Sequence, residues 1–182
     1  VFGINEQWGY FPSVGGAWRI NQENFMKSQN LFNDLKLRVS YGVTGNSAGF
    51  SPYTTKLIYG SVGTFYYQGS QISAIGALQN ENPDLKWEKT ATSNIGLDFS
   101  ILKGKVSGSV ELYNKKTTDL IWNYPVSTVL YPNGTLTANV GEMSNKGVEV
   151  SLNITPVQTA DFTWSTNINL AHNKNKIVSL SS

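Results

Sequence analysis

The chain has 182 residues, of which 14% are charged and 12% aromatic, and it contains no cysteine. Its net charge of +2 comes without a clustered stripe of lysine and arginine, so the electrostatic footprint of a nucleic-acid-binding protein is missing. The lack of cysteine excludes disulfides and thiolate metal sites, and no run of about 18 apolar residues predicts a membrane-spanning helix.

Six segments of the chain are predicted to be long strands. The first strand ends in residues 10–20, and the other five cover residues 34–46, 87–102, 106–122, 145–155 and 162–172. Within them, apolar and polar side chains alternate, as where Leu37 and Val39 flank Arg38. A period of two residues is typical of a strand with one apolar face.

The connections between these strands differ in length. Residues 103–105 and 156–161 are predicted to be short turns, whereas residues 47–85 and 123–143 are predicted to be long loops. We expect short hairpin strands at 53–59 and 64–68 in the first long loop. The Asn133-Gly134 pair in the second is a strong hairpin signal, and residues 25–32 are expected to form a short helical turn.

This arrangement predicts an all-β fold of antiparallel up-and-down strands, about six strands of a large transmembrane outer-membrane β-barrel. In such barrels the short turns are periplasmic and the long loops extracellular. The polar side chains expected to line the interior include Lys36, Arg38, Asn94, Asp98, Glu111 and Glu149. A soluble secreted β-sandwich, either an adhesin or a carbohydrate-binding module, remains an alternative because alternation also occurs in sandwiches.

Several stretches resemble one family, the SusC/RagA-type TonB-dependent (TonB-linked) outer-membrane transporters of the Bacteroidota. The resemblance covers well over half of the chain in the expected order. The stretches are YFPSVGGAWRI (10–20), DLKLRVSYGVTGN (34–46), NPDLKWEKTATSNIGLDF (82–99), GSVELYNKKTTDLI (108–121), NVGEMSNKGVEVSL (139–152) and AHNKNKI (171–177). Residues 47–80 are mainly unmatched, as expected of loops that vary with the substrate.

The resemblance implies a barrel-wall segment of an active nutrient importer in the bacterial outer membrane. It implies an internal plug, opening by TonB, a SusD-like lipoprotein as a lid, and uptake of oligosaccharides or peptides. The sequence itself shows no TonB box and no plug domain. We therefore expect residues 1–182 to be a partial, C-terminal-side piece of a longer barrel in contact with outer-membrane lipid, unable to transport by itself.

No enzymatic site is expected. His172 is the only imidazole, so a catalytic triad or a two-histidine metal site has no partners, and no cofactor motif is present. The candidate contact residues for a ligand or the lid are instead five loop aromatics: Tyr53, Tyr59, Phe65, Tyr66 and Tyr67. Their rings combine flat apolar surface with, in tyrosine, a polar edge.

Overall fold

The computed structural model describes residues 2–47 and 51–180 and consists mainly of one six-stranded sheet. The sheet contains, in spatial order, β1 (Ser13–Arg19), β2 (Phe32–Asn46), β5 (Glu88–Ile101), β6 (Val106–Pro125), β7 (Thr135–Gln158) and β8 (Thr163–Ser179). Every neighbouring pair is antiparallel. Because β2 pairs directly with β5, there is no Greek-key crossover, and the predicted up-and-down order is confirmed.

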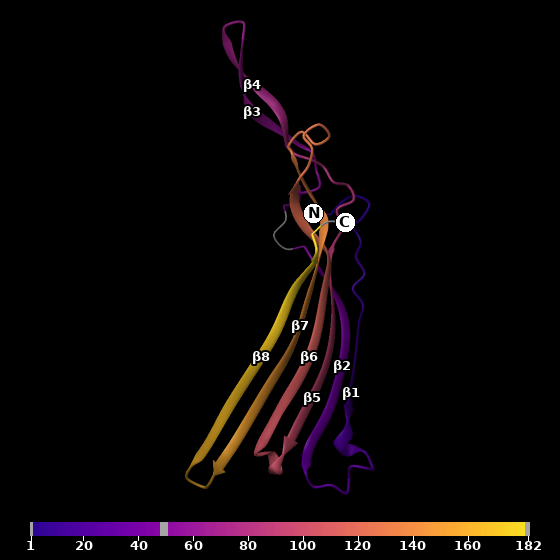
Figure 1. Ribbon diagram of the computed structural model, residues 1–182, viewed down its shortest axis with the longest axis vertical. Helices are drawn as coiled ribbons and strands as arrows, with labels where there is room; N and C mark the ends of the chain where they lie inside the picture. Colours follow the sequence, from indigo (N-terminus) through magenta and orange to yellow (C-terminus); the bar gives the residue numbers. More distant parts are fainter. Residues whose placement is uncertain (1, 48–50, 181–182) are drawn as a thin grey trace.

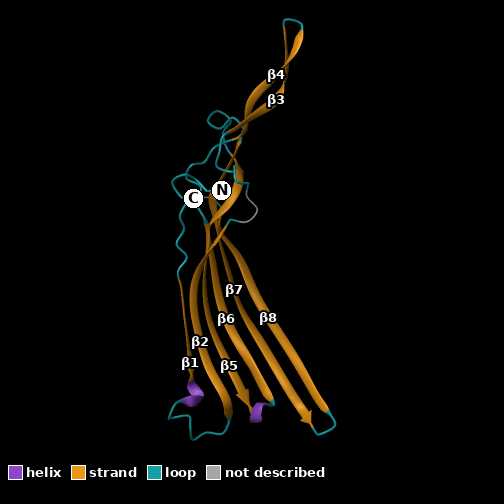
Figure 2. Cartoon of the chain, turned by 180° about the vertical axis from the view of Figure 1, so that it is seen from behind, coloured by secondary structure: helices purple, strands orange, loops and turns teal. Residues whose placement is uncertain are grey.

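The remaining strands, β3 (Ile58–Tyr67) and β4 (Ser70–Gln79), form a separate hairpin. Figure 1 shows this hairpin projecting beyond one end of the six-stranded sheet, while short connections close the other end. A sandwich requires a second sheet packed face to face on the first, and the hairpin does not do this. Figure 2 gives the same arrangement from behind, so the β-sandwich alternative is wrong.

Strand register collects the apolar side chains on one face of the sheet. One row of paired residues, taken across all six strands, contains Trp18, Leu37, Leu97, Val110, Val150 and Leu170. The next row along contains Leu35, Phe99, Gly108, Leu152 and Ile168. Leu97 is 36% and Leu170 62% exposed. Such an apolar face is suited to lipid, as in the wall of a membrane barrel.

The second predicted loop is mostly strand, which corrects the boundaries 123–143. β6 and β7 stay paired as far as Pro125 and Thr135, and only residues 126–134 connect them. Just beyond Pro125, the backbone N–H of Val126 donates to the carbonyl of Gly134 (2.9 Å), and Gly134 closes the connection with a φ of +68°. At about 3.3 Å per residue, the 24 residues of β7 are far longer than a membrane crossing requires.

The hairpin strands also differ from the predicted ranges 53–59 and 64–68. The two-residue turn that joins β3 to β4 is Gln68-Gly69, where both residues have positive φ, +50° and +78°. This is the backbone that matches the twist of two hairpin strands. Gly63 lies at a register shift, a β-bulge, inside β3.

The helical turn predicted at 25–32 is also wrong. The chain instead forms a 3-10 helix, η1 (Ile20–Gln22), followed by turns. These turns are closed by backbone hydrogen bonds between residues three positions apart, such as that from the N–H of Met26 to the carbonyl of Glu23 (2.9 Å). At the next short connection, a second 3-10 helix, η2 (Leu102–Gly104), occupies the predicted tight turn. No helix in the part of the chain that the structure describes has the length and apolarity to cross a membrane.

The segment between β4 and β5 is clasped against β7 near the base of the hairpin. Asn139 accepts a hydrogen bond from the backbone N–H of Lys86 (3.0 Å) and donates to the carbonyls of Lys86 (2.9 Å) and Asp119 (2.8 Å). Leu85, next to Lys86, is 0% exposed. The hairpin base is therefore attached to the sheet at a defined place.

Replacing Asn139 with alanine should loosen this clasp. The variant leaves the backbone groups of Lys86 unpaired, and an unsatisfied buried polar group costs about 1–3 kcal/mol. We expect faster proteolytic cleavage within residues 47–85 of the full-length protein in detergent. Asn133→Ala is the control, because its side-chain amide donates to a neighbouring side chain, Thr135 Oγ1 (3.1 Å), and not to the segment before β5. Equal cleavage of both variants would contradict the role of the clasp.

Candidate functional site

The polar face of the sheet carries a charge cluster on the half of the strands nearer the short connections. Arg38 on β2 makes two hydrogen bonds to Asp98 on β5, Nε to Oδ2 (2.9 Å) and Nη2 to Oδ1 (3.0 Å). Lys36 Nζ also contacts Asp98 Oδ2 at 2.9 Å. A bidentate arginine–carboxylate pair fixes geometry as well as charge. Asp98 is thus doubly compensated and orients both cations.

Gly96 makes this geometry possible. It lies between Arg38 and Glu111 in the cross-strand row, and a Cβ built at Gly96 would be only 2.8 Å from Arg38 Nη2 and 3.0 Å from Cζ. The absence of a side chain leaves room for the guanidinium above β5. Arg38 Nη2 thereby reaches within 3.7 Å of Glu111 Oε2 on the next strand.

The cluster ends in an uncompensated carboxylate on β7. Glu149 is paired directly with Glu111 in the β6–β7 ladder. Among residues 2–47 and 51–180, no cation lies within ion-pair distance of Glu149. Like charges directly opposite each other in a ladder repel. The polar face therefore presents excess negative charge along β6 and β7 that a cationic group would relieve.

All six polar residues expected to line the interior lie on this face. Asn94, one row from the charge cluster, pairs with Ser40 and Tyr113. Its Oδ1 atom is buried and accepts no hydrogen bond within the described part of the chain. The side chains that the sequence predicted to be together are therefore placed together by the register.

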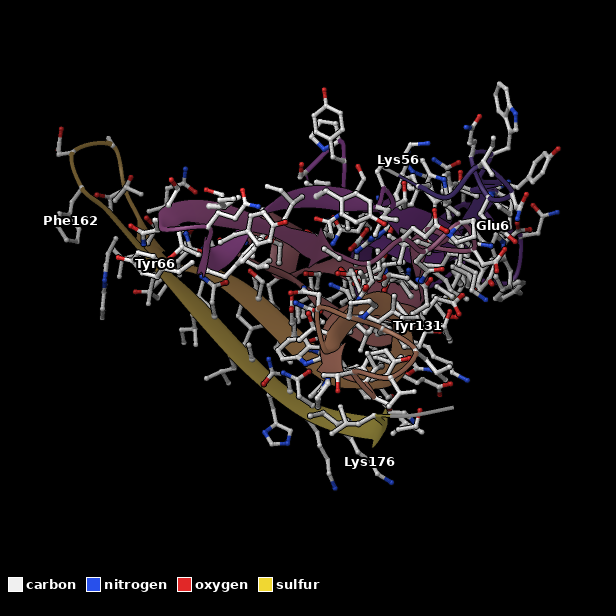
Figure 3. The ribbon with its side chains drawn as sticks, turned by 90° about the horizontal axis from the view of Figure 1, so that it is seen from above. Glu6, Lys56, Tyr66, Tyr131, Phe162 and Lys176 are labelled. Carbon is white, nitrogen blue, oxygen red and sulfur yellow. The ribbon has the colours of Figure 1, made fainter. Side chains whose placement is uncertain are left out.

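Three of the five candidate aromatics lie next to the hairpin turn. Phe65 and Tyr67 share one face of β3, with Ile72 opposite Phe65, whereas Tyr66 lies on the other face opposite Gln71. Their exposed fractions are 50%, 56% and 77% for Phe65, Tyr67 and Tyr66. Seen from above, Tyr66 lies well away from Tyr131 of the β6–β7 connection (Figure 3).

The other two candidates lie elsewhere. Tyr59, at the hairpin base, lines a hollow of about 440 Å³ together with Leu57, Glu81 and Tyr131. Tyr53 belongs to the turn before β3 and is 65% exposed. The five aromatics thus do not form one site but divide between the hairpin tip, the hairpin base and the preceding turn.

Apolar residues outside the predicted set of aromatics complete one face of the hairpin. Val62 lies over Gly76 and Leu78 over Gly60, on the same face as Phe65 and Ile72. The alternation of Ile72, Ala74, Gly76 and Leu78 in the stretch QISAIGALQ was the available signal. A two-stranded hairpin with one apolar face is marginal in water without a covering partner.

His172 lies on the apolar face of the sheet, opposite Val148. In the described ranges, no three His, Asp or Glu side chains gather in an arrangement that would hold a metal ion.

A family model and individual relatives both identify this chain as similar to TonB-dependent receptors. The family described as TonB dependent receptor-like, beta-barrel matches residues 1–179. The TonB-dependent receptor SusC of Bacteroides thetaiotaomicron is 38% identical over 98% of this chain and 18% of its own length. TonB-dependent receptor P39 of Formosa agariphila is also 38% identical, over 98% of this chain and 17% of its own length.

Solved structures agree with the sequence relatives. The RagAB peptide transporter has a chain that is 30% identical, with a TM-score of 0.83 over 98% of this chain and 19% of that chain. The RagAB peptide importer in the 'open-open' state gives a TM-score of 0.85 at the same identity and coverage. The chain thus spans less than a fifth of the length of these relatives.

Proposed function

Because this chain belongs to the TonB-dependent receptor β-barrel family of the outer membrane, we propose that it forms part of the wall of an energised importer of oligosaccharides or peptides. The observation that carries the proposal is the two-faced sheet, with apolar rows on one side and the Arg38–Asp98 charge cluster on the other. The segment contributes wall and loops, has no catalytic role and does not transport by itself.

The first test is uptake by cells that produce the full-length protein. Uptake of labelled oligosaccharides and peptides should be saturable for one of the two classes, and deletion of TonB should abolish it. Binding to the cell surface should survive the deletion, because recognition precedes the energised step. Uptake that persists without TonB would contradict the proposal.

The polar face lines the lumen and meets the plug of the same transporter. Glu149 and Glu111 are the contact points of this face, since the two residues stand opposite each other in the ladder. Among the residues that the structure describes, only Glu111 has a nearby cation, Arg38 at 3.7 Å. Lysine or arginine side chains of the plug would relieve this repulsion. The contact would hold the plug against this part of the wall between transport cycles.

Replacing both carboxylates, Glu111→Gln together with Glu149→Gln, should weaken plug retention. We expect greater entry of a large antibiotic such as vancomycin, measured as a lower inhibitory concentration in cells producing the variant at wild-type level. Asn169→Gln, also on the polar face and one row away, is the control. Unchanged antibiotic entry in the double variant would count against a plug contact at Glu149.

The lid contact is the apolar face of the hairpin. Phe65, Tyr67 and Ile72 project beyond the sheet with 40–56% of their surface exposed, and their face needs a cover. A SusD-like lipoprotein above the barrel supplies one. Tyr66, on the opposite face of β3, stays outside this contact.

Co-purification tests the lid contact. Full-length protein carrying Phe65→Ala and Tyr67→Ala should bind the lipoprotein at least about thirtyfold more weakly in mild detergent, because even one alanine substitution at a central interface aromatic costs about 2 kcal/mol or more. Tyr66→Ala is the matched control and should retain the wild-type amount. If Tyr66→Ala were the more damaging variant, the assigned faces would be reversed.

Tyr59 is the substrate-contact candidate because the hollow beside it combines aromatic walls, Tyr59 and Tyr131, with the carboxylate of Glu81. Flat aromatic walls stack on sugar rings or on peptide side chains. Tyr53, in the exposed turn before β3, is a second contact of the same kind.

A further inference from the structure

Three lysines gather on the apolar side of the sheet, where β7 and β8 continue past the apolar rows. Lys146 on β7 and Lys174 and Lys176 on β8, with Ser144 and Val178, line a hollow of about 380 Å³. All three lysine side chains are exposed. Figure 3 shows Lys176 pointing outward from the β8 ribbon, away from the rest of the sheet.

The arrangement lacks compensating negative charge. Lys146 and Lys174 are direct partners in the β7–β8 ladder, and Lys176 is the next residue of β8 on the same face. Like charges in this position are destabilising. Within residues 2–47 and 51–180 none of the three makes an ion pair. A nearby carboxylate on this side, Glu142, is engaged by Lys116 at 2.9 Å.

The three lysines lie at the margin of the apolar rows. On β7, Val150, Val148 and Lys146 follow one another on the apolar face toward the long-loop end, so the Cα of Lys146 lies about 7 Å along the strand from that of Val148. On β8, Leu170, His172 and Lys174 follow one another on this face in the same direction. Long lysine side chains at the margin of an apolar band reach the level of the lipid headgroups.

We propose that Lys146, Lys174 and Lys176 bind an anionic, phosphate-bearing lipid headgroup at the membrane surface. The inference rests on the barrel wall crossing the membrane as in the proposed function. A phosphate between the three ammonium groups would convert a repulsive pair into a site with favourable interactions for each lysine. On the long-loop side of the barrel, this lipid belongs to the outer leaflet.

The test uses the full-length transporter in neutral detergent, titrated with phosphatidylglycerol or phosphatidylcholine and followed by native mass spectrometry. Wild-type protein should retain phosphatidylglycerol preferentially. A lysine near an anionic membrane surface contributes enough for a loss of roughly fivefold in affinity, so Lys174→Gln should show that loss. The triple glutamine variant should lose the preference.

Lys115→Gln is the matched control, because Lys115 pairs with Asn145, next to Lys146, but points to the polar face. It should retain lipid like the wild type. Substrate uptake should be unchanged in the Lys174→Gln and triple glutamine variants, so lost lipid preference with intact uptake supports the site. Equal loss in Lys115→Gln, or full phosphatidylglycerol retention by the triple variant, overturns the inference, whereas TonB-independent uptake would contradict only the proposed function.

Discussion

Expressed alone, residues 1–182 should aggregate or require detergent to remain monodisperse. The sheet has two unpaired edges, β1 and β8, and one face with apolar rows such as that of Leu37, Leu97 and Val150. Unpaired edges recruit further strands, and large exposed apolar patches associate. Size-exclusion chromatography with and without detergent measures the effect, and the segment should neither hydrolyse nor transport a substrate.

One result for the isolated segment would contradict this expectation. A soluble monomer that unfolds cooperatively without detergent would mean that the apolar face is not adapted to lipid. In the full-length transporter of the proposed function, neighbouring strands would pair with these edges, so that protein in detergent is the positive control.

Val150→Arg in the full-length transporter should lower its stability in the membrane by about 2–4 kcal/mol, because folding into the bilayer transfers a charged side chain from water into hydrocarbon at the midplane of the lipid face. Val150 lies within the apolar rows of the sheet, paired with Val110 on β6 and Leu170 on β8. The adjacent variant Ser151→Arg should cost much less, since residue 151 points to the polar face with Ser109 and Asn169.

Reversible unfolding of both variants in lipid bilayers measures this difference. Urea titration followed by tryptophan fluorescence reports on the wall. Equal destabilisation by Val150→Arg and Ser151→Arg would contradict the two faces assigned to the sheet.

The amino-acid sequence by itself determined the strand class and the two faces of the wall. Alternation such as Leu37, Arg38, Val39 specifies which side chains share a face, because successive residues of a strand point to opposite sides. It also placed the short turn at 103–105. Family resemblance and the match to residues 1–179 then agree on the kind of protein.

Only the tertiary structure decided which side chains meet across strands. Asp98 lies 60 residues from Arg38, and no local pattern specifies a register between such distant segments. The same holds for Lys146 and Lys174. The length of β7 was missed for a related reason: residues 135–144 are held as strand by pairing with β6. Strand propensity depends on such partners, so the ends of the strands, the charge cluster and the lysine site emerge only when the sheet is assembled.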